Sequence, residues 1–144
     1  EKSVQDNINK GMDYLQFALV VCDANNLKKT NDTEGHVTGD EYIKGSANLL
    51  CVIFDHSPVF RVGGDEFVVF LRGSDYINRD ELMNRLRDRI LENLRLGSGP
   101  VIASGMAEYD SKTDSTVSEI FNRADKEMYE NKQLLKKKEK AAGR

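Results

Sequence analysis

Acidic residues in this sequence stand at two places where carboxylates can do metal-dependent chemistry. Asp23 directly follows the apolar run Phe17–Cys22, so its side chain is expected at the polar end of a buried strand. Asp65 lies in the tip Gly63–Glu66, which separates two β-prone runs and so predicts a hairpin. If the hairpin lies beside the first strand, Asp23 and Asp65 share one or two magnesium ions. Such a site serves phosphoryl transfer, because the rest of the octahedron is filled by water and substrate phosphate oxygens.

Both positions also have a purely structural explanation. Asp is a common turn residue at the end of a strand. The glycine pair Gly63 and Gly64 fits a tight turn that needs positive φ. The structural explanation does not account for Asp65 and Glu66, since adjacent negative charges destabilise a turn unless a cation neutralises them. Both interpretations stay open on these residues alone.

The elements that must position these residues follow from hydrophobic periodicity, which predicts the order αβαββαβα. The predicted helices are Val4–Leu15, Thr38–Phe54 with a capping box at its start and Pro58 at its end, Met83–Leu94 and Val117–Met128. The predicted strands are Phe17–Cys22, Val59–Val62, Phe67–Leu71 and Val101–Met106. We expect an α/β (α+β) fold with a mixed central sheet flanked by helices, built on a ferredoxin-like βαββαβ core.

Composition narrows the class of protein. A chain of 144 residues that is 39% hydrophobic has the size of one domain, residues 1–144, with one core. Its net charge of -3 argues against a nucleic-acid partner, which would need a basic face. No apolar run is long enough to span a bilayer, so we expect no membrane contact by this domain, although a parent protein can still be membrane-anchored. Cys22 and Cys51 lie in apolar runs, which fits a reducing cytoplasmic location.

Three motifs in order make the sequence resemble a known family. They are DANNLKKTNDTEGHVTGDEYI, RVGGDEFVVF and ADKEMYENK, and the resemblance covers nearly the entire chain. The chain is similar to the GGDEF family of diguanylate cyclases, which join two GTP into cyclic di-GMP and release pyrophosphate. The resemblance implies a fold like the adenylate cyclase core and the polymerase palm, with Mg²⁺, or alternatively Mn²⁺, as cofactor. It also implies a transient homodimer with one GTP per subunit, and an N-terminal sensor or receiver domain in a longer parent chain.

The resemblance also implies roles for individual residues. Asp23, the Ala24 carbonyl and Asp65 match metal ligands, while Asp65 and Glu66 match the catalytic acids, with Glu66 in the metal or proton-transfer shell. Residues that match GTP-binding positions are Asn26, Leu27, Lys28, Asn31, Asp40, Gly63, Gly64, Lys132 and Lys136.

Among these residues, Asn31 and Asp40 match guanine-reading positions. A carboxylate accepts from the ring N–H and exocyclic amine of guanine, a pair that adenine lacks, so GTP is expected over ATP. Asp40 also has a structural alternative, because an acid in the first turn of a helix is favoured by the dipole. Lys132 has one too, since most lysine runs are solvated helix faces.

The sequence departs from the family pattern in three ways. Asn25 stands where many members have a second Asp, and Phe54–Ser57 lacks the inhibitory Arg-x-x-Asp, so product inhibition through that motif is not expected. The usual opening Asp-x-Leu-Thr segment is also missing, which suggests a trimmed piece of a longer protein. The main alternative is a catalytically weak module that binds GTP or a partner as a regulatory domain. A cyclase for another dinucleotide and a purely structural domain are weaker alternatives.

Overall fold

The centre of the fold is the apolar strand β1 (Phe17–Ala24), in which every residue is buried except the half-buried Asp23. The computed structural model describes residues 16–24 and 36–142. Within them, β1 pairs with β3 (Glu66–Arg72) on one side and with β4 (Ile102–Glu108) on the other. Since helices cover both faces of this central strand, apolar side chains are needed on both, which is why the sequence shows an unbroken run instead of an alternation.

The four described strands form one sheet in the order β2-β3-β1-β4, with the short strand β2 (Val59–Arg61) at one edge. This is the ferredoxin-like order, and the predicted fold class is confirmed. All three strand pairs are antiparallel, so this sheet is antiparallel and not mixed. Each crossover joins two strands that run the same way, but one oppositely directed strand is inserted between them, which makes all neighbours antiparallel.

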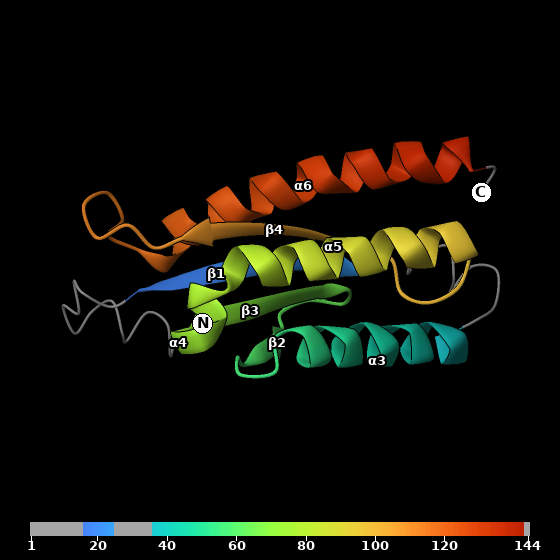
Figure 1. Cartoon of the computed structure of the whole chain (residues 1–144), viewed down its shortest axis with the longest axis horizontal. Coiled ribbons are helices and arrows are strands. Elements are labelled where there is room, and N and C mark those ends of the chain that lie inside the picture. The colour runs from blue at the N-terminus through green and yellow to red at the C-terminus, as the bar shows by residue number, and fades with distance from the viewer. Residues whose placement is uncertain (1–15, 25–35, 143–144) are drawn as a thin grey trace.

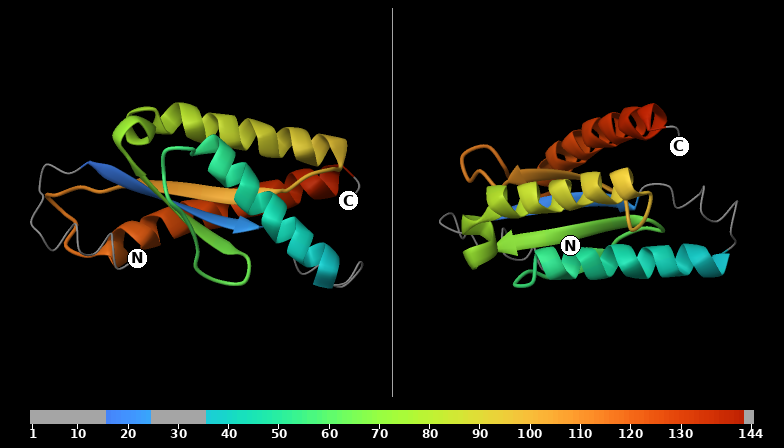
Figure 2. Two further views of the ribbon diagram at one scale, coloured as in Figure 1. Left: turned by 90° about the horizontal axis from the view of Figure 1, so that it is seen from below. Right: turned by 45° about the vertical axis from the view of Figure 1, so that its right-hand side comes forward.

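Within the described residues, three long helices cover the two faces of the sheet (Figures 1 and 2). Helices α3 (His36–Ile53) and α5 (Arg79–Leu96) contact each other and lie on one face. Helix α6 (Val117–Ala141) packs on β4 and β1 from the other side. None of the helices within residues 36–141 carries an apolar stretch long enough to span a bilayer.

Some boundaries differ from the sequence prediction. Helix α3 begins at His36, so Thr38 lies inside the helix and is not its N-cap. The capping-box spacing is a local pattern, and this helix begins two residues before the position that it predicts. The helix also ends at Ile53, before Pro58 is reached, and Ser57 N–H closes a turn by donating to the Phe54 carbonyl at 3.1 Å. The predicted helix Val4–Leu15 lies outside the described residues.

The short helix α4 (Gly73–Ile77) is an element that periodicity did not predict. Its buried Asp75 accepts hydrogen bonds from the backbone N–H of His56, at 3.1 Å, and from the Ser57 hydroxyl. A helix of this length has too few residues to display a hydrophobic period. Its contacts fix the connection between α3 and β2.

Close packing between α6 and β4 depends on Gly105. Its Cα lies so near the backbone of Ala124 and Met128 that any Cβ would overlap these main-chain atoms. Gly105 pairs with Val21 in the sheet, and two positions further along the small Ala103 pairs with Asp23. The glycine therefore lets α6 lie directly on the sheet, and the next helical turn passes over the polar end of β1.

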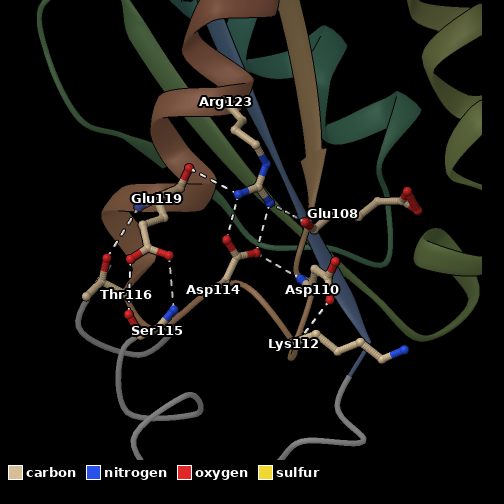
Figure 3. A network of polar contacts seen from close by, with 8 residues as sticks. All are labelled: Glu108, Asp110, Lys112, Asp114, Ser115, Thr116, Glu119 and Arg123. Atoms are coloured by element: carbon tan, nitrogen blue, oxygen red, sulfur yellow. Dashed lines mark hydrogen bonds and ion pairs between the residues drawn. The ribbon is translucent and has the colours of Figure 1, made fainter.

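The start of α6 is held by a polar network (Figure 3). Arg123 donates to both carboxylate oxygens of Asp114, at 2.6 and 2.9 Å, and to the backbone carbonyl of Glu108 at 2.6 Å. The N-cap Thr116 accepts from the backbone N–H of Glu119 at 3.4 Å, in the manner of a capping box. The network ties the end of β4 to the first turns of α6.

Candidate functional site

The acid at the end of β1 and the acids of the hairpin tip lie side by side. Asp23 pairs with Glu66 in the sheet register, and the next residue, Ala24, donates its backbone N–H to the carbonyl of Asp65 at 2.7 Å. Asp23 and Glu66 lie directly opposite each other on adjacent strands, so their side chains share one face of the sheet. This is the face on which Gly105 meets α6. The predicted position of the hairpin tip beside the end of β1 is therefore confirmed, and the charge of Asp65 acts on Asp23.

The backbone of the tip is held in place by an arginine that the sequence reasoning missed. Arg61 Nε donates to the carbonyls of Gly63 and Gly64 at 3.2 and 3.1 Å, and an Nη donates again to the carbonyl of Gly64. Val62 N–H donates to the carbonyl of Glu66 at 2.9 Å and closes the loop. An arginine two residues before a glycine pair is a local signal that could have identified this clamp.

The tip glycines do not have the conformation that the structural explanation required. Among the described glycines, positive φ occurs at Gly73, Gly97 and Gly99, but at neither tip glycine. A Cβ built on Gly64 would meet nothing within 4 Å, and one on Gly63 would make an ordinary 3.6 Å contact. The chain thus has no conformational need for glycine at position 64. What the absence of a side chain does provide is open space above the backbone.

Helix α6 brings basic residues to the acids. Lys132 Nζ donates to Asp23 Oδ2 at 3.1 Å, and Lys136 is exposed one turn further on. The same face of α6 also carries Asp125, seven residues before Lys132, whose charge reaches Glu66. Asp125 belongs to the ADKEMYENK motif, but the sequence reasoning gave it no role.

Electrostatics at this site favour an additional cation. Burial raises the pKa of Asp23, the Asp65 carboxylate raises it further, and the hydrogen bond from Lys132 with the charge of Lys136 lowers it. Burial also raises the pKa of Glu66, with added repulsion from Asp125, Asp23 and Asp65. A raised carboxyl pKa means that the negative charge is incompletely compensated. The two lysines therefore do not neutralise this cluster.

The donor set fits a magnesium ion that binds together with a phosphorylated substrate. Within residues 16–24 and 36–142, no three Asp, Glu, His or Cys side chains are arranged as a complete metal site. Magnesium does not need such a site, because one or two carboxylates suffice when water and phosphate supply the other oxygens. Asp23 and Asp65 offer two carboxylates whose charges interact, and a Cβ at the neighbouring Gly64 would meet no atom within 4 Å.

The remaining predicted residues are more dispersed. Ala24 is buried at the end of β1, beside Asp65. Asp40 is exposed near the start of α3, and within the described part of the chain no hydrogen bond or ion pair connects it to the acids. The positions outside the described residues are Asn25, Asn26, Leu27, Lys28 and Asn31.

A groove lies beside the acids on the same face of the sheet. Its lining comes from β1, β2 with the residue that follows it, β3 and the start of α6: Leu19, Phe60, Val62, Glu66, Val68, Phe70, Val117, Ser118 and Phe121. Apart from Glu66 at its end, this lining is largely apolar. Ser118 is the one hydroxyl donor in this lining, which carries no basic side chain, so the groove offers few of the donors that a triphosphate requires.

Comparison with known proteins identifies the family. The profile described as diguanylate cyclase, GGDEF domain, matches residues 1–138. The cyclic di-GMP phosphodiesterase PdeR of Escherichia coli K12 is 29% identical over 139 residues, which are 91% of this chain and 21% of PdeR. A diguanylate cyclase of Vibrio cholerae serotype O1 is 30% identical over 119 residues, 81% of this chain and 37% of that protein. The chain belongs to the GGDEF domain family.

The solved structures show the same fold. The active GGEEF domain of a diguanylate cyclase from Vibrio cholerae superposes with a TM-score of 0.75 at 22% identity, covering 93% of this chain and 90% of that one. The curated relatives are longer proteins, since the chain spans 21% of PdeR and 51% of a Streptomyces griseus relative. The family and the fold are thus established for this domain.

Proposed function

We propose that this domain is a diguanylate cyclase that condenses two GTP molecules into cyclic di-GMP and releases two pyrophosphates. The observation that carries the proposal is the pairing of Asp23 and the hairpin tip on one face of the sheet, with Lys132 of α6 opposite them. Carboxylates for a divalent cation, an open glycine tip and a lysine for phosphate are the parts that phosphoryl transfer needs. Each subunit binds one GTP, and a symmetric product calls for a two-fold homodimer.

In this proposal each acid has a separate task. Asp23 and Asp65, with the Ala24 carbonyl, hold magnesium, which when bound supplies positive charge to the α-phosphate and the attacking oxygen. Glu66 accepts the proton of the ribose 3′-hydroxyl of the facing nucleotide. Glu66 suits this task because it lies directly opposite Asp23 in the sheet, beside the acids proposed to hold magnesium. The bond to pyrophosphate breaks as the new 3′-oxygen to phosphorus bond forms.

The nucleotide is held by two groups of residues. Lys132 and Lys136 neutralise the phosphates, together with Lys28 and the backbone N–H groups of Asn26 and Leu27. Asn31 and Asp40 read the guanine edge. Asp40 supports this assignment because its exposed carboxylate is available as a double acceptor.

The direct test is to identify the product. Incubation with GTP and Mg²⁺, followed by mass analysis, should yield cyclic di-GMP and pyrophosphate, whereas ATP should yield no product. Specific activity should rise with protein concentration until dimers dominate. Recovery of unchanged GTP from a folded dimer, across Mg²⁺ and Mn²⁺ concentrations, would overturn the proposal.

A regulatory module without turnover is the second candidate. The observation that favours it is the match to PdeR, a GGDEF relative that is named as a phosphodiesterase. In that case GTP with Mg²⁺ should raise the melting temperature while no pyrophosphate appears.

The proposal also covers the longer parent protein and the place where it acts. We infer that an N-terminal sensor or receiver domain controls the dimer, since the curated relatives are longer than this chain. A cytoplasmic site of action fits Cys22 and Cys51, which are both free thiols.

Replacing Gly64 by Ala separates ligand binding from folding. The backbone at Gly64 lacks positive φ and its Cβ position is open, so the melting temperature should stay equal or rise slightly. The added methyl group enters the space beside the acids, and turnover of GTP should fall about 10- to 100-fold. Thermal unfolding and pyrophosphate release measure the two effects. Unchanged turnover would mean that no ligand approaches this backbone.

A further inference from the structure

The contact between Lys132 and Asp23 suggests a function for the lysine before any nucleotide binds. The two side chains are 28% and 14% exposed, and their atoms lie 3.1 Å apart. They come from α6 and β1, 109 positions apart in the chain. The Lys132 ammonium therefore lies against the carboxylate that the proposed function assigns to the metal.

The charges around this contact affect how a divalent cation binds to Asp23. Asp65 repels Asp23, and Glu66 is repelled by Asp125, Asp23 and Asp65. Lys132 lowers the pKa of both Asp23 and Glu66. A divalent cation that approached Asp23 with Lys132 in place would meet a positive charge at short distance. The same ammonium is the group expected to contact the triphosphate. Lys132 thus has two anionic partners, the Asp23 carboxylate and the triphosphate, and its ammonium cannot pair with both at the same time.

We propose that Lys132 is the counter-cation of Asp23 in the nucleotide-free domain and transfers to the phosphates when nucleotide binds. This inference rests on the proposed function and adds an order of binding to it. Cation alone binds weakly, because the lysine competes for Asp23, whereas cation and nucleotide bind cooperatively. A lysine suits the exchange, since its four-carbon stem is flexible and its ammonium needs no fixed geometry. The exchange keeps Asp23 paired with a positive charge until substrate arrives.

The test measures Mn²⁺ binding to nucleotide-free protein by titration calorimetry. In Lys132→Gln the competitor is removed, and the affinity for Mn²⁺ alone should rise about tenfold, a usual size for coupling between sites. Lys132→Arg keeps a positive charge and should retain weak binding. Lys137→Gln is the matched control, because this exposed lysine lies five residues beyond Lys132 on another side of α6 and donates no hydrogen bond to Asp23. Its effect should be less than about twofold.

A second substitution tests whether the gain in Mn²⁺ affinity depends on the Asp23 carboxylate. Asp23→Asn combined with Lys132→Gln should abolish the increase in Mn²⁺ affinity, with circular dichroism confirming that each variant is folded. Unchanged or weaker Mn²⁺ binding by folded Lys132→Gln would overturn the inference, even if the wild type makes cyclic di-GMP. Tighter Mn²⁺ binding by that variant would sustain the inference even if the wild type turned over no GTP, so failure of the proposed function is distinguishable.

Discussion

Asp65→Asn should lower the rate of pyrophosphate release from GTP and Mg²⁺ by about 100- to 1,000-fold, corresponding to a loss of several kcal/mol of charge stabilisation in the transition state. Asn keeps the shape of the side chain but removes the negative charge that a magnesium ligand needs. The backbone contact of Asp65 with Ala24 is made by its carbonyl, which the substitution retains. The fold should therefore survive while the chemistry fails.

The control for this experiment is Asp88→Asn. Asp88 is an exposed acid on α5, the helix that lies on the opposite face of the sheet from α6. Its replacement removes the same charge from the protein, and turnover should stay within about twofold because exposed charges at a distance are screened by salt. Equal losses in the two variants would show that net charge, and not the tip carboxylate, controls the rate.

Asp114→Ala should lower the free energy of unfolding by about 3 kcal/mol, because it leaves the Arg123 guanidinium without the carboxylate that accepts both of its Nη groups. The Asp114 side chain is 2% exposed, whereas that of Arg123 is 45% exposed, so water recovers part of the loss. Urea unfolding measures the effect. Glu92→Ala breaks the exposed pair with Arg95 and should cost far less, because water and salt screen an ion pair at the surface. Equal costs would mean that burial adds nothing to the Asp114 pair.

The stabilisation by Asp114 should also depend on pH in one direction. The hydrogen bonds from Arg123 hold the pKa of Asp114 below its usual value of 3.8, despite the opposing effect of burial. A lowered pKa in the folded state gives stability that is present above the unfolded value and lost as pH falls through the folded one. The difference between wild type and Asp114→Ala should thus be constant from pH 5 to 7 and shrink below about pH 4. A difference that is the same at pH 7 and pH 2.5 would contradict this account.

The sequence by itself determined the long elements and the main acidic positions. The unbroken apolar run of β1, the hairpin on either side of Gly63–Gly64 and the periodic face of α6 were each predicted from local pattern, and each is present. The meeting of Asp23 with Asp65 followed as well, because a small sheet leaves few places for a hairpin. Local patterns succeed here since burial on one or two faces dictates the spacing of apolar residues.

Only the tertiary structure decided the antiparallel order of the sheet, the short helix α4, the Arg61 clamp and the pairing of Lys132 with Asp23. Strand order depends on which strand lies between the two strands that a crossover joins. The hydrophobic periodicity of a single element carries no information about that neighbour. Lys132 reaches Asp23 because Gly105 lets α6 lie directly on the sheet, and residues 109 positions apart meet only through that packing. A lysine in a basic helix looks the same in sequence whether it contacts water or a buried carboxylate, and the difference arises from the position of the helix on the sheet.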